Sequence, residues 1–139
     1  MKIQFTVNGS VIAATLADNR MAGEFARMLP LTITMHDFFG REKFGALPAS
    51  ACLSGKGTQT REYEVGDLVC WAPGPDLSIL YRQDGQPISG AWHFLGRIDE
   101  GAALFAEPGP LQVTIEAAPK TLPFDLRRRR ARQGRGTTA

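Results

Sequence analysis

An Asn-Gly pair between two short alternating segments restricts the fold of this sequence more than any other feature. Residues 2–7 (KIQFTV) and 10–16 (SVIAATL) flank Asn8-Gly9. Both central positions of a type I′ turn need a positive φ, which Asn and Gly adopt most easily, so the pair is a strong hairpin signal. The chain is therefore predicted to begin as an antiparallel β-hairpin.

A short helix is predicted directly after this hairpin. Asp18-Asn19 offers a side-chain oxygen that can cap the first turn of a helix, and Pro30 ends the segment because proline cannot continue a helix. The apolar residues between them fall on one helical stripe: Met21, Phe25, Met28 and Leu29. We expect this stripe to belong to the core and not to a ligand surface.

The rest of the chain reads as a series of short strands separated by turns. Predicted strands cover residues 31–35, 68–72, 77–81, 92–98 and 111–117, with a loop and short strand over 36–48, surface loops over 54–67 and 82–90, and a helical turn over 100–106. Many short strands with a single helix are typical of a closed antiparallel barrel or a sandwich. The predicted fold class is mainly β, with one domain over residues 1–119.

Composition and the N-terminal pattern favour an ordinary globular protein of the cytoplasm. The chain has 139 residues, of which 43% are hydrophobic and 22% are charged. No apolar run approaches the roughly 20 residues that span a bilayer, and residues 1–7 alternate like a strand and lack the apolar region of a signal peptide. We therefore expect no membrane partner.

The residues suited to metal, thiol or cofactor chemistry are sparse. Cys52 and Cys70 have no CxxC spacing, so reduced thiols are expected. His36 and His93 are the two histidines, and no paired cysteine or carboxylate spacing accompanies them, so no metal site is expected. The glycine loop at residues 54–60 (SGKGTQT) lacks a flanking apolar strand or helix. Neither a phosphate site nor a cofactor is therefore predicted.

Charge is distributed unevenly between the body of the chain and its C-terminal end. Residues 1–119 contain nine basic and 13 acidic residues, a net charge of −4, whereas residues 120–139 contain seven basic residues and one acidic residue, a net charge of +6. Such an end is most often a disordered, solvated tail. The alternative is an arm that binds nucleic acid or an acidic partner.

Three stretches of the sequence resemble the small bacterial cyclophilin-like family, compact β-barrel relatives of the cyclophilin peptidyl-prolyl isomerases. They are DNRMAGEFARMLPLTITMHDFFGREKFGALP (18–48), GDLVCWAPGPDLSILY (66–81) and LGRIDEG (95–101). The resemblance covers residues 1 to about 117. It implies a cyclophilin-like closed antiparallel β-barrel with one short α-helix after the first hairpin.

The resemblance also raises the chemistry of prolyl isomerisation. Rotation about an X–Pro bond crosses a barrier of about 18–20 kcal/mol, and a well-placed arginine can stabilise the twisted amide. True cyclophilins carry their arginine in a Phe-His-Arg strand followed by Phe-Met-x-Gln-Gly-Gly, and neither string is present here. The catalytic arginine therefore carries over to no position, and Arg41 and Arg97 remain the candidates.

A binding cleft is predicted beside the segment HDFFGREK (36–43), which includes Phe38, Phe39 and Lys43. The cleft would be completed by Tyr81 at a strand end and by His93. Strand alternation places His93 opposite Trp92 and Phe94, so either side could face the cleft. Two adjacent aromatic residues on a loop cannot easily both be buried, so one of Phe38 and Phe39 is expected to contact a ligand. Trp71 is expected to be structural.

The sequence thus leaves three functional hypotheses open. The first is a barrel that binds a small molecule or a peptide segment in its cleft without established catalysis. The second is a weak peptidyl-prolyl cis-trans isomerase that uses Arg41 or Arg97. The third assigns binding of nucleic acid or an acidic partner to the arginine-rich tail. The sequence does not determine the oligomeric state.

Overall fold

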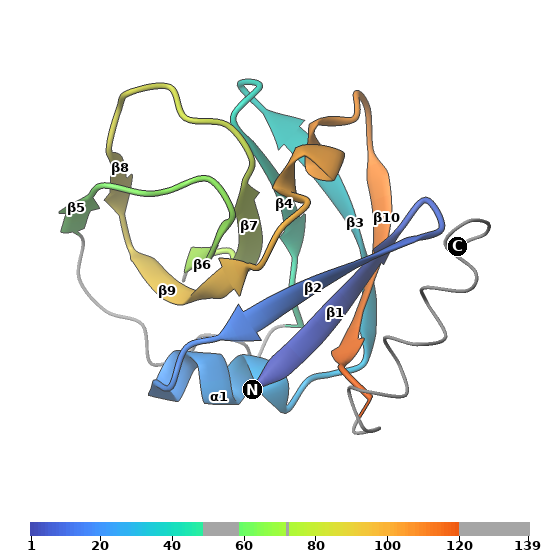
Figure 1. Cartoon of the computed structure of the whole chain (residues 1–139). Coiled ribbons are helices and arrows are strands. Elements are labelled where there is room, and N and C mark those ends of the chain that lie inside the picture. Colours follow the sequence, from blue (N-terminus) through green and yellow to red (C-terminus); the bar gives the residue numbers. More distant parts are fainter. Residues whose placement is uncertain (49–58, 72, 120–139) are drawn as a thin grey trace.

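The computed structural model describes residues 1–48, 59–71 and 73–119, and in this part of the chain eight strands close into an antiparallel barrel (Figure 1). Two further strands pair with each other in a separate ribbon. In chain order the elements are β1 (Lys2–Val7), β2 (Ser10–Leu16), α1 (Arg20–Ala26), β3 (Leu31–Phe38), β4 (Glu42–Ala46), β5 (Gln59–Arg61), β6 (Asp67–Trp71), β7 (Asp76–Leu80), β8 (Ile88–Gly90), β9 (Trp92–Ile98), the 3-10 helix η1 (Ala102–Ala106) and β10 (Leu111–Ala117).

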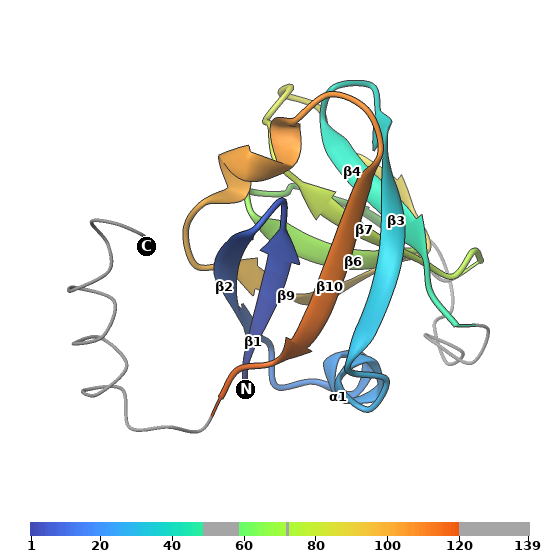
Figure 2. The same cartoon turned by 90° about the vertical axis from the view of Figure 1, so that its right-hand side faces the viewer.

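The first hairpin and the closure of the barrel follow from the N-terminal sequence. Asn8 and Gly9 have φ values of 50° and 80°, which confirms the predicted turn of the β1–β2 hairpin. Strand β1 also pairs with β10, and β2 pairs with β9, so the barrel closes in the order β1-β10-β3-β4-β7-β6-β9-β2. The first and last strands therefore lie side by side (Figure 2).

The predicted helix is confirmed as α1, which lies across one end of the barrel (Figures 1 and 2). The Asn19 side chain caps it by accepting a hydrogen bond of 2.8 Å from the Ala22 backbone N–H. The same side chain donates to the backbone oxygen of Phe94 on β9. Met21 and Phe25 are buried in the core as expected from the apolar stripe. The helix ends at Ala26, before the predicted end at Pro30, so Met28 and Leu29 follow it and pack against the core only partly buried. No helix of the described residues is long and apolar enough to span a membrane.

Apolar side chains gather in two clusters, one inside the barrel and one outside it. The interior cluster includes Phe5, whose ring meets the η1 residue Phe105 edge-on at a centroid distance of 5.8 Å. The second cluster consists of Tyr63, Val69, Leu80 and Ile88, with Trp92 and Phe94 packed against it. It lies between the outer face of the barrel and the β5–β8 ribbon, so it supports that ribbon.

Two regions predicted as surface loops contain the β5–β8 ribbon. Strand β5 falls within residues 54–67, and β8 falls within residues 82–90. Both strands have three residues, and the pairing of Thr60 with Ser89 is part of their register. Strands of three residues are too short to show an alternating apolar pattern, so they become recognisable only through the pairing that joins them.

The expectation of reduced thiols is wrong, because Cys70 is disulfide-bonded in the structure. Cys70 lies fully buried on β6. Spacing along the sequence does not reveal which cysteine side chains the fold brings together, and the CxxC criterion therefore missed this bond. Cys52 lies outside the described residues. Residues 54–58 of the glycine loop and the basic tail at 120–139 also lie outside them, so tail-mediated binding stays a prediction.

Gly96 sits where β9 passes very close to the backbone of β2. A Cβ atom added at Gly96 would lie 2.3 Å from the backbone oxygen of Thr15 and 2.8 Å from Cα of Leu16. Both contacts are with backbone atoms, so no side-chain rotation can relieve them. The glycine of the Leu-Gly-Arg-Ile stretch is therefore required by the packing of the barrel.

Gly96→Ala is expected to lower the free energy of unfolding by at least roughly 2 kcal/mol, because the methyl group forces β2 and β9 apart. Urea unfolding followed by circular dichroism measures the effect. Gly23→Ala on α1 is the matched control, since its new Cβ meets nothing within 4 Å, and we expect it to be neutral or to stabilise by up to about 1 kcal/mol. Equal midpoints for Gly96→Ala and the wild type would contradict the close approach.

Candidate functional site

A pocket of about 420 Å³ lies on the outside of the barrel, where β3, β4, β7, β6 and β9 contribute residues to one wall. The residues around β8, Pro87, Ile88 and Ser89, form the facing wall. We call this space the outer pocket. Its volume falls within the roughly 300–1,000 Å³ of pockets that bind small organic molecules.

Strand alternation decides which side chains of β4 and β7 reach the outer pocket. Glu42 and Phe44 of β4 line it, as do Asp76 and Ser78 of β7. The residues between them face the barrel interior, where Leu77 belongs to the core cluster. The outer pocket is therefore built on the face of the sheet opposite the core.

The charged group at the base of the outer pocket is a network of Arg41, Glu42 and Ser78. Nε and Nη2 of Arg41 donate to Oε1 of Glu42 at 3.0 and 2.6 Å. The hydroxyl of Ser78 donates to the other carboxylate oxygen at 3.0 Å. Glu42 is only 2% exposed, so a charged carboxylate there depends on these donors. The network fixes Glu42 and neutralises most of the charge of Arg41.

Backbone hydrogen bonds of the β3–β4 turn hold Arg41 in place. Its N–H donates to the backbone oxygen of Phe38 at 3.1 Å, and its own carbonyl accepts from the N–H of Tyr81 at 3.0 Å. The guanidinium carbon lies 5.7 Å from the ring centroid of Tyr63. The turn, the end of β7 and the segment before β6 thus all position this side chain.

Four aromatic rings contribute to the apolar lining of the outer pocket, together with Pro87 and Ile88. Trp71 and Trp92 have ring centroids 6.3 Å apart, and Phe38 meets Phe44 edge-on at 6.0 Å. Trp92 is held by the hydrogen bond of 2.8 Å that its indole N–H donates to the backbone oxygen of Ser89. Trp71 is 38% exposed, so part of its ring faces the outer pocket and it is not only a core residue.

Asp76 is the third charged residue of the outer pocket. It is half-buried, and this burial raises the pKa of its carboxyl group. Among the described residues, no side-chain donor or cation contacts this carboxylate. Asp76 therefore differs from Glu42, whose two oxygens both accept hydrogen bonds.

The structure places two of the residues proposed from the sequence, Phe38 and Arg41, in the outer pocket. Lys43 faces the other way and is completely buried. Its ammonium group donates to the backbone oxygens of Glu107 and Gly109 at 2.7 and 3.0 Å. Lys43 thereby ties β4 to the segment before β10.

Tyr81 and His93 do not line the outer pocket. Tyr81 is buried, and its hydroxyl donates a hydrogen bond to Asp37. Burial, followed by the bond to Asp37, raises the pKa of Tyr81 to about 12. His93 lies opposite Trp92 and Phe94 on β9, and its Nε2 is buried without a hydrogen-bond partner among the described residues. The sequence left open whether His93 or its neighbours face the cleft, and the structure places Trp92 in the lining of the outer pocket.

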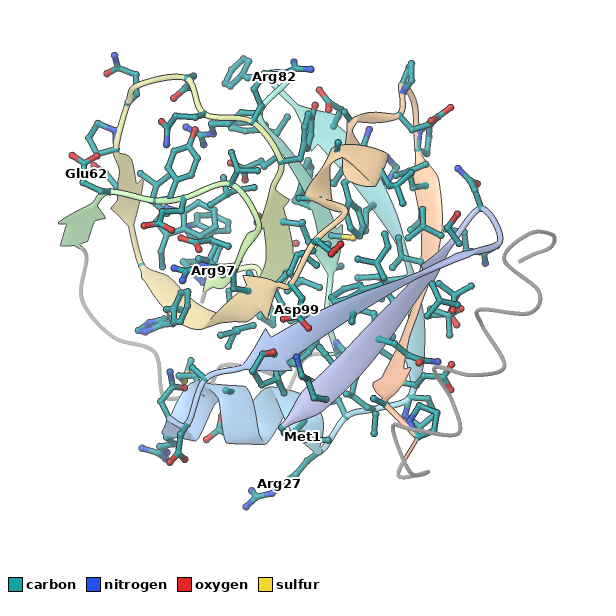
Figure 3. All side chains as sticks on the ribbon, viewed as in Figure 1. Met1, Arg27, Glu62, Arg82, Arg97 and Asp99 are labelled. Atoms are coloured by element: carbon teal, nitrogen blue, oxygen red, sulfur yellow. The ribbon has the colours of Figure 1, made fainter. Side chains whose placement is uncertain are left out.

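The two remaining proposed residues lie outside the lining as well. Arg97 is on β9, labelled in Figure 3, and its Nε donates to Oδ1 of Asp67 at 2.7 Å. Phe39 is 85% exposed, and its ring lies 4.3 Å from that of Phe38. Phe39 also has a φ of 55°, an uncommon value for a bulky residue. Its ring extends the apolar surface beyond Phe38 at the pocket rim.

Sequence reasoning missed several lining residues, above all Glu42, Asp76 and Trp92. The signal that could have found them is alternation: in DLSIL the residues Asp76 and Ser78 share one face, and in EKFGA the residues Glu42 and Phe44 share one face. Polar residues at such alternate positions, Asp76 and Ser78 on β7 and Glu42 on β4, mark an outer face that meets something other than the core.

The comparisons with known proteins agree with the architecture. A family model described as the cyclophilin-like family matches residues 5–116. The solution structure of a hypothetical protein from Archaeoglobus fulgidus has a similar fold, with a TM-score of 0.65 and 18% sequence identity, over 85% of this chain and 95% of that chain. No curated protein matches this chain.

The bond between Tyr81 and Asp37 generates a prediction about acid titration. Tyr81 is the largest cause that lowers the pKa of Asp37 below its usual 3.8. In Tyr81→Phe the pKa of Asp37 is therefore expected to rise, which carbon-detected NMR titration of the carboxyl group measures. Because a lowered folded-state pKa stabilises the fold above the unfolded pKa of about 3.9, the variant should lose less stability as pH falls below 4. An unchanged Asp37 midpoint would contradict this assignment.

Proposed function

The chain belongs to the cyclophilin-like family, and from that premise we propose that it binds a small organic molecule or a peptide segment in the outer pocket. The observation that carries the proposal is a pocket of about 420 Å³ whose apolar lining surrounds a fixed polar network. Binding sites for small molecules typically combine aromatic walls with a few placed polar groups. The outer pocket has both.

The polar network gives the outer pocket the means to orient a ligand. Arg41 and Glu42 are held by each other and by Ser78 before any ligand arrives, so little ordering of side chains opposes binding. The aromatic rings supply the contact area. Ligand affinity should therefore depend on the rings, and ligand orientation should depend on the network.

Trp71→Leu is expected to weaken ligand binding by about tenfold or more, because it removes an exposed aromatic ring of the lining. A library of fragments and short peptides, followed by ¹H–¹⁵N shift mapping on the full chain, identifies ligands and their affinities. Val11→Ala is the matched control: Val11 is an exposed apolar residue on β2 outside the lining, and it should leave affinity unchanged. Binding that maps to a different face, and that Trp71→Leu does not affect, would contradict the proposal.

A second candidate function, peptidyl-prolyl isomerisation, is favoured by the position of Arg41. Its guanidinium reaches the outer pocket, and Glu42 occupies only two of its N–H groups, on Nε and Nη2. An arginine has five such donors, and Nη1 of Arg41 lies 3.7 Å from a carboxylate oxygen of Asp84. That distance is an ion pair and too long for a hydrogen bond, so donors on Nη1 remain for a substrate amide. The aromatic lining could hold a proline ring beside them. This arrangement contains the two elements that an isomerase needs.

Two-dimensional NMR exchange on cis/trans proline peptides tests the isomerase candidate. If the pocket catalyses isomerisation, catalytic amounts of the protein accelerate exchange, and Arg41→Ala reduces that rate by about 10²-fold or more, as for the loss of a transition-state donor. Arg97→Ala is the control, because Arg97 is bound to Asp67 outside the lining. Unchanged exchange across several X–Pro peptides would exclude this function for those substrates and leave binding as the activity of the pocket.

A further inference from the structure

Cross-strand pairing places a carboxylate and two indoles in one row of the outer pocket. Asp76 of β7 pairs with Trp71 of β6, and Trp71 pairs in turn with Trp92 of β9. Directly paired residues on one face of a sheet have Cβ atoms about 4.5–5.5 Å apart. We call these three residues the Asp76–Trp71–Trp92 row, and all three line the outer pocket.

The charges around the outer pocket leave an excess of negative charge beside this row. The charged residues of the lining are Arg41, Glu42 and Asp76. Arg41 and Glu42 form an ion pair of 2.6 Å, so their charges largely cancel. The carboxylate of Asp76 has no cation or hydrogen-bond donor on it among the described residues. The lining thus has a net charge of −1, located next to Trp71, whose other cross-strand partner is Trp92.

Burial makes this unpaired carboxylate unfavourable while the pocket is empty. It raises the pKa of Asp76 because the charged form is partly desolvated. A neutral apolar ligand would desolvate the carboxylate further without giving it a partner. An anionic ligand would meet Asp76 directly and find the guanidinium of Arg41 already paired with Glu42. Only a cationic ligand both pairs with the charge of Asp76 and interacts favourably with the faces of the aromatic rings.

Aromatic side chains favour the same ligand charge. The faces of aromatic rings attract cations, tryptophan most strongly, and quaternary ammonium groups are commonly recognised by clusters of such rings. Here the ring centroids of Trp71 and Trp92 lie 6.3 Å apart, and Phe38, Phe44, Pro87 and Ile88 add further apolar surface to the lining. The carboxylate of Asp76 and the aromatic rings are separate features of the pocket, and both favour a positively charged ligand.

From this row and its unpaired charge we propose that the ligand of the outer pocket is an organic cation: an ammonium or quaternary ammonium group on an apolar body. This inference rests on the proposed binding function and specifies its ligand class. The cationic group lies beside Asp76 and the two indoles, and the apolar body contacts Phe38 and Phe44. Arg41 and Glu42 remain paired with each other when the ligand binds.

Choline and its neutral isostere 3,3-dimethyl-1-butanol test the inference, because they share shape and differ in charge. Shift titration of the full chain at neutral pH gives both affinities. We expect choline to bind at least about fivefold more tightly, as a cation over aromatic rings beside a carboxylate should. Asp76→Asn should remove this preference. Glu100→Gln, which removes the same charge from an exposed residue outside the lining, should retain it.

The outcomes separate the ligand class from the proposed function. Equal affinity of the two probes, or a choline preference that survives Asp76→Asn, overturns the inference and leaves binding in the outer pocket standing. Binding of neither probe also overturns it, and the fragment and peptide library then decides independently whether the pocket binds a ligand at all. A choline preference lost in Asp76→Asn and kept in Glu100→Gln supports it.

Discussion

The alternation of β4 between two environments is the constraint on which the rest of the structure depends. Lys43 and Gly45 face the barrel interior, where Lys43 binds the carbonyls before β10 and Gly45 lies so close to β3 that a Cβ would come within 2.7 Å of the Thr34 oxygen. Glu42 and Phe44 must consequently face outward. A register shift of one residue would exchange the two sets and place a glycine and a buried lysine in the outer pocket. The packing of Lys43 and Gly45 inside the barrel therefore determines which side chains of β4 line the outer pocket.

This division gives the two faces of the sheet separate roles. The interior cluster and α1 stabilise the barrel without any residue of the Arg41–Glu42–Ser78 network. The β5–β8 ribbon is supported by its own small cluster around Tyr63 and supplies the facing wall of the pocket. Substitutions on the outer face can therefore alter the lining of the outer pocket at little cost to the core. A barrel of this kind can carry different sites on one fold.

The sequence predicted those features that local patterns encode. Asn8-Gly9 predicted the first hairpin because only a few residues tolerate both positive φ values, and Trp92–Ile98 and Leu111–Ala117 were predicted at the bounds that the structure has. The ribbon was missed because strands of only three residues show no periodicity along the sequence and depend on tertiary pairing. Lys43 was placed at the cleft because its segment was read as a loop, and a loop has no alternation that would show its direction. The outer pocket is lined by residues of five barrel strands and of the ribbon. These residues come together only in the folded chain, so the sequence pattern could not predict the pocket.

Incorporation of 5-fluorotryptophan provides the most direct measurement, because the two tryptophans of the chain, Trp71 and Trp92, both line the outer pocket. The ¹⁹F spectrum then contains one resonance from Trp71 and one from Trp92. Both resonances can be followed while a ligand is titrated into the protein. Binding in the outer pocket predicts that ligands move at least one of these resonances with the same affinity that calorimetry gives. A ligand that binds the protein while both resonances stay unchanged would contradict the assignment of function to this pocket.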